Sequence, residues 1–424
     1  MNPLSKIFDV IVIGGGPSGM MAAGRAGSRG KSVLLLEKNK VLGAKLSISG
    51  GGRCNITNAE DDTRALLKHY GKAEDFLYTP FSKFSNLDTF TFFKDRGLPL
   101  VVEARKRAFP ATQNASDVTR VLMEYLSEGR VSVRTGVEIR SVQTKDGKII
   151  GVLAKDNTLY QARSFIVATG GYSHPETGST GDGFRWLKDL GHTISPANPS
   201  VVPVAVHEEW VKALSGTSLS FMKIIFFVDG KRAFAKTGKI LFTHFGLSGP
   251  LILNSSKQIS NLLHEGRVTA TIDMYPDTDH GALEKDILRA LDANKNKDLV
   301  NVFDLIVPHG MDKAVLSLLA LPESHIKVHS FTKEDRKRLV HLLKAMPVEI
   351  TSLMGMDRAV ISDGGVPLEE IDMRTMRSTR CENLYLTGDL LHIDRPSGGF
   401  SLQLCWTTGF IAGDSVSVSE HSTT

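Results

Sequence analysis

The chain opens with two short apolar runs on either side of a segment rich in small residues. Residues 8–13 (FDVIVI) and 32–36 (SVLLL) are β-branched or aliphatic runs of strand length. Between them a helix is expected over about residues 17–27, and its small side chains allow close packing on a sheet. This order of strand, helix and strand predicts an α/β fold with parallel strands.

Three glycines follow the first expected strand in the spacing G-x-G-x-x-G. Gly14 permits a tight turn, Gly16 leaves out a Cβ so that a pyrophosphate can lie against the backbone, and Gly19 lets helix and strand approach. The helix N-terminus then offers free N–H groups and a positive dipole end to phosphates. Glu37 stands about 20 residues further on, as a ribose-binding carboxylate should. These features predict a dinucleotide-binding unit.

Glycine-rich endings recur at distant points of the chain. They are residues 49–58 (SGGGRCNITN), 165–171 (FIVATGG), 384–389 (LYLTGD) and 397–400 (SGGF). A second glycine loop so close behind the ribose acid suits a cofactor that continues past its pyrophosphate. A segment with helical spacing, residues 402–412, follows the last of these stretches.

These motifs carry a family resemblance. The stretch SGGGRCNITN and the C-terminal segment 364–413, with its TGD and SGGFSLQ, resemble the HI0933-like flavoproteins, within the FAD-binding oxidoreductases that include fumarate reductase and glutathione reductase. Together with the first glycine loop, the match frames nearly the whole chain. The resemblance implies an FAD-dependent oxidoreductase with a Rossmann-like FAD-binding domain of the glutathione reductase type. That α/β domain would be split by an inserted β-rich domain with a helical subdomain.

The resemblance also implies FAD contacts on the adenosine side. Gly14, Gly16, Ser18 and Gly19 would hold the pyrophosphate, and Glu37 would hold the adenosine ribose. The other contacts would come from Lys38 and Lys45 along the phosphates or ribose, from the backbone of Val137 at the adenine, and from Thr169 and Gly170 at the adenosine end.

On the flavin side, the resemblance implies contacts from both ends of the chain. They would come from Gly51 and Gly52 beside the ring, from Gly388 and Asp389 at the ribityl chain or phosphate, and from the backbone of Gly399 and Phe400 at the isoalloxazine. The family often has a basic residue where this chain has Ala44, and a glutamate where it has Asp389. The first departure weakens one phosphate contact, and the second shortens the reach of the carboxylate.

A second dinucleotide-binding unit is not predicted. Residues 178–183 (GSTGDG) have no β-branched strand before them, and they resemble the GDG segment of fumarate reductase-type flavoproteins. NAD(P)H, as a possible electron donor, would therefore visit transiently or be replaced by another reductant.

The expected domain order places the insertion between two parts of the FAD domain. Residues 1–191 and 356–424 would form the FAD-binding domain, residues 192–278 a β-rich domain and residues 279–355 a helical subdomain. Within the β-rich part, residues 224–234 predict a hairpin with an Asp229-Gly230 turn. Segments such as ALEKDILRALDAN and KEDRKRLVHLLKAM have helical spacing.

Three residues are candidates for the chemistry beside the flavin. Hydride transfer from a flavin to a conjugated C=C leaves the neighbouring carbon in need of a proton. The thiol of Cys54 is one candidate acid, although packing in a tight turn explains this residue equally well. Arg53 would stabilise negative charge or form a structural salt bridge. His392 is a second candidate proton donor, although a structural loop histidine is commoner.

Composition adds limited information on compartment and partners. Three cysteines in 424 residues cannot build a disulfide framework, no spacing indicates a metal site, and the first apolar run is too short for a signal peptide, so a cytoplasmic protein is expected. The net charge of +5 is a mild bias. It fits a solvated surface or a polyanionic partner such as ribosomal RNA, and the cluster Lys231, Arg232, Lys236 and Lys239 favours RNA.

The substrate is approached through the same resemblance. HI0933-like proteins are associated with C=C reduction, on steroid-like enones in some members and on uridine of large-subunit ribosomal RNA in others. The C5=C6 bond of uracil is conjugated, so one hydride-plus-proton mechanism covers both. The function expected first is FAD-dependent reduction of uridine to dihydrouridine in 23S ribosomal RNA. The alternatives are a small-molecule ene-reductase or NAD(P)H dehydrogenase, and a flavin-binding redox sensor without turnover.

Overall fold

The computed structural model describes residues 7–321, 326–355, 357–359 and 361–416. The chain forms two compact units, one of Met1–Pro199 with Val360–Thr424 and one of Ser200–Ala359. The second unit is thus an insertion in the first. The boundary expected at residue 356 falls on a residue outside the described ones, and the finer division at residue 279 stays a prediction.

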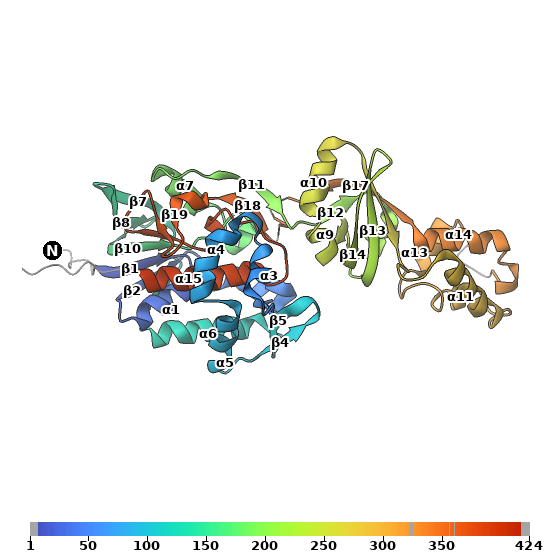
Figure 1. Ribbon diagram of the computed structural model, residues 1–424, viewed down its shortest axis with the longest axis horizontal. Helices are drawn as coiled ribbons and strands as arrows, with labels where there is room; N and C mark the ends of the chain where they lie inside the picture. Colours follow the sequence, from blue (N-terminus) through green and yellow to red (C-terminus); the bar gives the residue numbers. More distant parts are fainter. Residues whose placement is uncertain (1–6, 322–325, 356, 360, 417–424) are drawn as a thin grey trace, which may run out of the picture. The chain divides into compact units, whose positions relative to one another are not determined.

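The first unit is built on a seven-stranded sheet with the order β19-β20-β21-β10-β1-β2-β6 (Figure 1). Five of these strands pair in parallel. They are β1 (Phe8–Ile13), β2 (Val33–Glu37), β6 (Ser132–Thr135), β10 (Ala162–Val167) and β21 (Leu384–Leu386). The short strands β19 (Ile371–Asp372) and β20 (Arg377–Ser378) add an antiparallel edge. The split Rossmann-like α/β fold predicted from the sequence is confirmed. A C-terminal strand, β21, lies directly beside β10.

Three helices pack closely in the first unit because glycines remove side chains where they touch. Helix α1 (Pro17–Ser28) contacts both α6 (Ala115–Glu128) and α15 (Phe400–Ser415) (Figure 1). A Cβ on Gly409 of α15 would lie 2.4 Å from the Ser18 carbonyl oxygen, and one on Gly413 would lie 2.3 Å from the Ala22 carbonyl oxygen. A Cβ on Gly24 would lie 2.3 Å from the Tyr125 ring. The small-residue pattern of α1 thus serves helix–helix as well as helix–sheet packing.

Smaller elements complete the first unit. A three-stranded antiparallel sheet, β3-β5-β4, contains Thr57–Asn58, Arg107–Pro110 and Leu100–Glu103. A second one, β7-β8-β9, contains Ile139–Lys145, Lys148–Ala154 and Leu159–Tyr160. Strand β11 (Ser195–Ser200) pairs with β18 (Ile361–Gly365). The remaining helices are α2 (Ala44–Ile48), α3 (Thr63–Lys68), α4 (Glu74–Lys83), α5 (Asn86–Asp95) and α7 (Asp182–Asp189).

The second unit contains a closed six-stranded barrel of order β12-β15-β14-β13-β16-β17. Its strands are β12 (Val204–Val206), β13 (Ser218–Val228), β14 (Lys231–Thr243), β15 (Gly246–Ser248), β16 (Val268–Asp273) and β17 (Met346–Leu353). Strands β13 and β14 form the predicted hairpin, and its turn residues Asp229 and Gly230 both have positive φ. The inserted β-rich domain expected from the sequence is therefore present.

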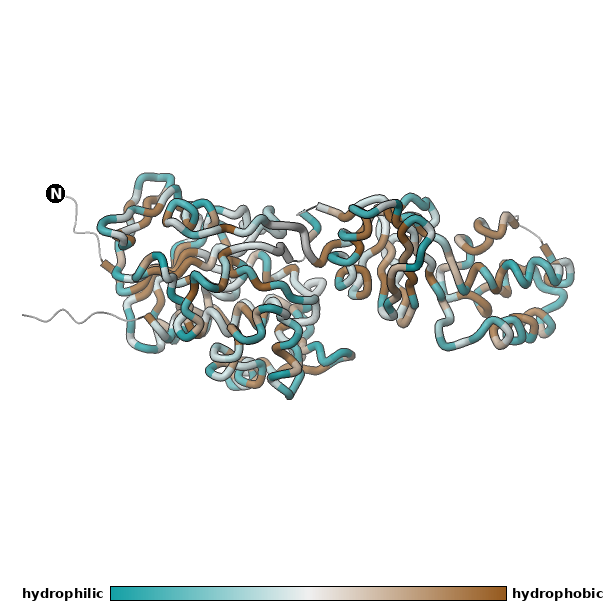
Figure 2. The backbone as a smooth tube through the Cα atoms, turned by 45° about the horizontal axis from the view of Figure 1, so that its top comes forward, coloured by the Kyte–Doolittle hydropathy of each residue, from teal (hydrophilic) through white to brown (hydrophobic). Residues whose placement is uncertain are grey.

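Helices accompany the barrel in this unit. The longer ones are α10 (Ser256–Glu265), α11 (His280–Asp292), α13 (Asp312–Leu318) and α14 (Lys333–Lys344). The hydrophobic positions gather inside each unit, with hydrophilic ones on the surface (Figure 2). No helix within the described ranges is long and apolar enough to cross a membrane.

Candidate dinucleotide-binding site

A pocket of about 880 Å³, counting space open to solvent, lies at the carboxyl ends of the parallel strands. Ligands of open α/β sheets bind at this edge. Ten of the sequence-predicted residues line this pocket. They are Gly14, Gly16, Ser18, Glu37, Lys38, Lys45, Val137, Thr169, Gly170 and Asp389.

The first glycine loop leaves its backbone open toward the pocket. Gly14 has φ +110°, and a Cβ there would lie 2.4 Å from the Ala168 carbonyl oxygen. A Cβ on Gly19 would lie 1.9 Å from the Gly14 carbonyl oxygen, whereas one on Gly16 would meet no protein atom within 4 Å. No side chain caps the N-terminus of α1. Gly14 and Gly19 therefore let the chain turn and pack, and Gly16 leaves space beside a helix N-terminus, where an anion binds favourably.

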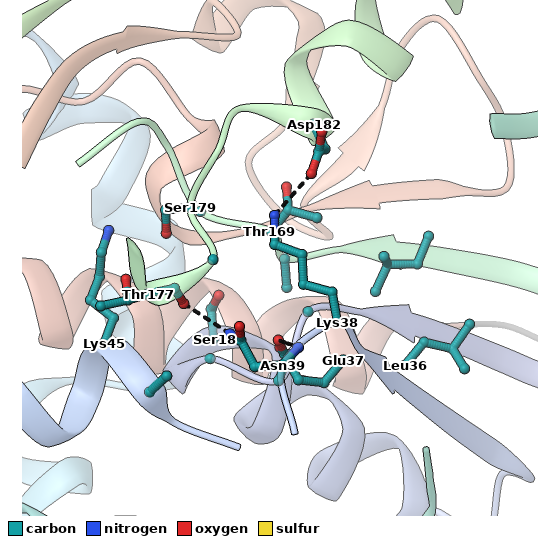
Figure 3. A pocket seen from close by; sticks show the side chains of 18 of the residues that line it. Ser18, Leu36, Glu37, Lys38, Asn39, Lys45, Thr169, Thr177, Ser179 and Asp182 are labelled. Atoms are coloured by element: carbon teal, nitrogen blue, oxygen red, sulfur yellow. Dashed lines mark hydrogen bonds and ion pairs between the residues drawn. The ribbon is translucent and has the colours of Figure 1, made fainter. Parts of the chain in front are cut away.

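Glu37 ends β2 with its carboxylate held in place by two backbone N–H groups. Gly15 N donates to Oε2 at 2.6 Å, and Asn39 N donates to Oε1 at 2.7 Å (Figure 3). The residue is only 8% exposed. A carboxylate has about four acceptor positions, so each oxygen can still accept a hydrogen bond from a hydroxyl group. This geometry suits recognition of a ribose.

The two predicted lysines differ in their partners. Lys38 Nζ lies 2.9 Å from an Asp182 carboxylate oxygen and 2.6 Å from Thr180 Oγ1, and Figure 3 shows it reaching across to Asp182. Lys45 Nζ lies 2.7 Å from Ser173 Oγ and 4.0 Å from an Asp389 carboxylate oxygen. Burial lowers the pKa of Lys45, and the nearby Asp389 opposes that shift. An anion in the pocket would stabilise the charged form of Lys45.

Two buried polar atoms of pocket-lining residues have no hydrogen-bond partner in the protein. They are Thr169 Oγ1 and the indole N–H of Trp186. An unpaired buried polar group is unfavourable, so such atoms point to a polar ligand. With the open face of Gly16 and the Glu37 carboxylate, these atoms fit an extended nucleotide such as FAD.

Val137 lines the pocket, but its backbone N–H already forms a hydrogen bond within the protein. Its N–H donates to the Glu37 carbonyl oxygen at 2.9 Å. The expected adenine contact would therefore have to use the Val137 carbonyl oxygen.

Asp389 lies on the turn after β21 and is neutralised by a residue that the sequence did not assign to FAD. The guanidinium of Arg395 forms an ion pair with the Asp389 carboxylate and also donates to Ser401 Oγ at 3.0 Å and to the Ile393 carbonyl oxygen at 2.6 Å. The Arg395 side chain is 1% exposed. A cation six residues after the acid was visible in the sequence, but its burial was not.

Other pocket residues were also missed by sequence reasoning. They are Asn39, Thr177, Ser179, Asp182, Trp186 and Cys405. Two of them, Ser179 and Asp182, belong to the GSTGDG segment, whose resemblance to fumarate reductase-type flavoproteins was the available signal. Burial raises the pKa of Cys405 to about 12, so its thiol stays protonated.

Apart from Asp389, the residues expected at the flavin end do not line this pocket. Gly51 and Gly52 are exposed and have φ +69° and +82°. Gly388, with φ +63°, donates its N–H to Thr408 Oγ1 at 3.0 Å. Gly399 has φ +98°, and a Cβ there would lie 2.3 Å from the Thr57 backbone. Phe400 packs its ring in the core, and its carbonyl oxygen accepts from Tyr70 Oη at 2.9 Å. Their contacts with the flavin stay predictions.

The geometry favours structural roles for Arg53 and Cys54. Arg53 pairs with Glu103 at 2.8 Å, donates to Gln113 Oε1 at 2.8 Å, and lies over the Phe109 ring at 4.1 Å. Cys54 has no exposed surface, and burial raises its pKa to about 12. A thiol enclosed in this way cannot reach a substrate without rearrangement, which favours the tight-turn interpretation of Cys54. His392, by contrast, is exposed on the loop that carries Asp389.

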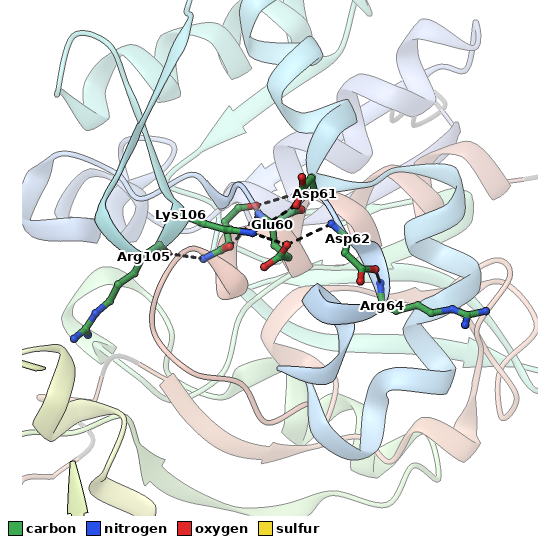
Figure 4. Close-up of polar contacts among 8 residues, drawn as sticks. Glu60, Asp61, Asp62, Arg64, Arg105 and Lys106 are labelled. Atoms are coloured by element: carbon green, nitrogen blue, oxygen red, sulfur yellow. Dashed lines mark hydrogen bonds and ion pairs between the residues drawn. The ribbon is translucent and has the colours of Figure 1, made fainter. Parts of the chain in front are cut away.

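The β4–β5 hairpin is tied to the loop before α15. Asn58 Nδ2 donates to the Arg105 carbonyl oxygen at 3.3 Å and to the Gly398 carbonyl oxygen at 3.2 Å. Lys106 Nζ pairs with Glu60 at 2.7 Å, while the Arg105 side chain points away from those carboxylates (Figure 4). Both Arg105 and Lys106 have positive φ. The amide of Asn58 thus connects the β4–β5 hairpin to the loop that carries Gly398 and Gly399.

The described residues lack the side-chain groups that bind metal ions. Among the described residues, no three His, Cys, Asp or Glu side chains form a group that could hold a metal ion. The polar groups at the strand ends are instead those of a nucleotide site.

The fold and the site define an FAD-dependent oxidoreductase. The chain belongs to the HI0933-like family: the HI0933-like protein Rossmann domain matches residues 8–415. Over 410 residues it is 28% identical to the 3-dehydro-bile acid delta(4,6)-reductase of Clostridium scindens, covering 95% of this chain and 97% of that protein. Over 415 residues it is 26% identical to the ribosomal RNA dihydrouridine synthase of Escherichia coli, covering 98% and 99%.

Solved structures show the same fold. The 3-ketosteroid-delta4-(5alpha)-dehydrogenase of Rhodococcus jostii has a TM-score of 0.55 at 16% identity, with 98% of each chain covered. A flavocytochrome c3 fumarate reductase has a TM-score of 0.51 at 15% identity, covering 97% of this chain and 78% of that one. These similarities extend over the inserted unit as well as the Rossmann-like unit.

Proposed function

We propose that this enzyme reduces a conjugated ring C=C bond, and that its substrate is uridine in 23S ribosomal RNA. The observation that carries the proposal is the full-length similarity to two relatives whose names share one chemistry. The names delta(4,6)-reductase and dihydrouridine synthase both describe the reduction of a C=C bond. One arrangement of cofactor and proton donor therefore serves both substrates.

The residues of this chain would hold the cofactor at several points. The N-terminus of α1 with Gly16 would bind the pyrophosphate, and Glu37 the adenosine ribose. Bound FAD supplies hydride-transfer chemistry. Asp389 is fixed in orientation by Arg395, because that guanidinium is buried and makes two further hydrogen bonds. This rigidity favours a defined position for whichever hydroxyl or phosphate Asp389 contacts.

His392 is the proton donor that we propose for the product carbon. It is exposed, its neighbours Leu391 and Ile393 are buried, and its backbone N–H donates to the Val366 carbonyl oxygen at 2.9 Å. The loop is therefore anchored while the imidazole is accessible. An imidazole can donate a proton from a ring nitrogen, as general acid catalysis requires.

The electron donor and the compartment follow from the same proposal. NAD(P)H would reduce the flavin in a transient encounter, because the chain has only one strand–G-x-G-x-x-G–helix unit. A ribosomal RNA substrate places the enzyme in the cytoplasm. Stopped-flow bleaching of flavin absorbance by NADPH or NADH tests the donor.

One alternative has specific support, and a second stays a prediction from the sequence. Similarity to the bile-acid reductase favours a small-molecule ene-reductase or dehydrogenase acting on an enone. A flavin-binding redox sensor without turnover would share the nucleotide pocket but show no product. Steady-state assays with NADPH and an enone, or with ribosomal RNA, separate these three functions.

The decisive experiment is mass mapping of uridines in 23S ribosomal RNA from a deletion strain. We expect one dihydrouridine to disappear and to return on complementation with the wild-type gene. Complementation with the His392→Ala variant should restore it poorly. An unchanged modification pattern in the deletion strain would eliminate the RNA substrate.

A further inference from the structure

The outer face of the β13–β14 hairpin carries aromatic and basic side chains. On β13, the buried Met222, Ile224 and Phe226 alternate with residues on the opposite face. On β14, Lys239 lies between the buried Gly238 and Ile240, and Arg232 lies opposite Phe227. We call the outward set, Phe221, Lys223, Phe227, Arg232 and Lys239, the outer stripe.

The cations of the outer stripe are not neutralised by the protein. Within the described residues, Lys223, Arg232 and Lys239 form no ion pair. The acid opposite Lys223, Asp273, pairs with Lys344 at 2.8 Å instead. The turn acid Asp229 accepts the backbone N–H of Arg267 at 3.0 Å. The hairpin therefore presents a local excess of positive charge.

Phe221 is unfavourable in two respects. It occupies a bulge between the pairs Leu219–Ile240 and Met222–Gly238, where it has φ +62°. This region disfavours bulky L-residues and normally selects glycine. The side chain is also 70% exposed, and no aromatic or cationic contact within the described part of the chain covers its ring. A strained and exposed residue of this kind indicates a function in binding another molecule.

We propose that the outer stripe is a docking surface for single-stranded RNA. A base would stack on Phe221, and phosphates would contact Lys239, Lys223 and Arg232. Exposed aromatics beside unpaired cations are the features that bind single strands. This inference rests on the proposed function, since it names the surface by which that RNA is held.

Protection of a sheet edge does not account for the stripe. Among the described residues, β14 pairs with β15 over 241–243, and no strand pairs with 231–240 on the side away from β13. Lysines on such an edge prevent strand association. An exposed phenylalanine has the opposite effect, because apolar surface promotes association. The ring of Phe221 thus needs a separate explanation.

The test compares stability and RNA binding in Phe221→Gly. Glycine relieves the left-handed backbone, so the Tm should stay unchanged or rise by up to about 4 °C. The Kd for a fluorescein-labelled oligouridylate, measured by anisotropy, should rise at least about fivefold, because stacking of one base is lost. For Lys239→Gln, the slope of log Kd against log salt should fall by about 0.7.

Matched controls use the same unit. Leu305→Ala removes another exposed apolar side chain, 65% exposed, and Lys285→Gln removes an exposed helical cation. Both should bind the oligouridylate like the wild type. Wild-type-like affinity of Phe221→Gly, or a changed oligomeric state with unchanged affinity, would overturn the inference while leaving the enzyme's activity on ribosomal RNA intact. A wild-type protein that neither binds RNA nor forms dihydrouridine would instead refute the proposed function.

Discussion

Asp389 and Arg395, six residues apart on one loop, form an ion pair whose guanidinium is buried below the surface of the nucleotide pocket. The carboxylate lines the pocket, while the arginine holds it from behind through contacts with Ser401 and Ile393. Removing one member of a buried pair leaves an uncompensated charge.

Arg395→Met should therefore destabilise the first unit by about 3–5 kcal/mol and lower FAD retention. Urea unfolding and the ratio of flavin to protein absorbance measure the two effects. Lys148→Gln, which breaks the exposed pair with Glu382, is the control and should cost at most about 1 kcal/mol. Equal stabilities of the two variants would mean that the buried pair has no special role.

Gly409→Ala tests the close contact of α15 with α1. Its Cβ would lie 2.4 Å from the Ser18 carbonyl oxygen, so the helices must separate. We expect a loss of about 1–3 kcal/mol in urea unfolding. Gly281→Ala in α11 is the matched change, because its Cβ would meet only Asp279 Oδ1, at 3.4 Å. Alanine should there stabilise the helix by up to about 1 kcal/mol. Effects of the same sign at both positions would contradict this packing account.

The main fold could be predicted because local signals were strong and adjacent. Gly14, Gly19 and Glu37 belong to one contiguous unit, so their spacing predicted the turn, the packing and the position of the candidate ribose carboxylate together. Tertiary pairings were not readable in the same way. Nothing local shows that Arg395 is buried against Asp389, or that the indole of Trp186 lacks a partner.

The flavin end was also harder to predict than the adenosine end. Cys54 follows three glycines, and the sequence was equally consistent with a proton donor and with packing in a tight turn. Only the fold shows that the thiol is buried. Arg53 was equally consistent with charge stabilisation or a salt bridge, and only the fold brings Glu103 and Gln113 to it. Residues whose partners lie about fifty positions away need the structure to be interpreted.

Stability of the first unit should fall on acidification because of His192 and Glu370. His192 Nδ1 lies 2.7 Å from Glu370 Oε2, and its Nε2 lies 2.8 Å from Ser378 Oγ. Burial lowers the pKa of His192, so protonation below its ordinary pKa near 6.5 disfavours the folded state. Burial alone would raise the pKa of Glu370, but hydrogen bonds from Thr193, His192 and Arg380 lower it to about 2.

Both groups act in the same direction, so their contribution is full above about pH 6.5. It declines first as unfolded histidine protonates, and then from about pH 4.5 toward 2 as the glutamate loses its advantage. Urea midpoints measured from pH 8 to pH 2 should decrease, and Glu370→Gln should flatten the part of the decrease below about pH 4.5. A variant with an unaltered pH profile would show that other groups dominate acid unfolding.

His392→Ala and Cys54→Ala should separate the two proton-donor candidates. The accessible imidazole is expected to matter, so His392→Ala should slow product formation by about 10²- to 10⁴-fold with FAD content unchanged. Cys54 has no exposed surface, so Cys54→Ala should lower stability through lost packing but leave turnover near that of the wild type. Single-turnover assays of the pre-reduced enzyme isolate this step from reduction by NADPH.

His392→Gln is the control variant, because it keeps a polar side chain of similar size but has no ring nitrogen to supply the proton. It should be as slow as His392→Ala. A Cys54→Ala enzyme that holds FAD but fails in turnover, with His392→Ala unimpaired, would reverse the assignment.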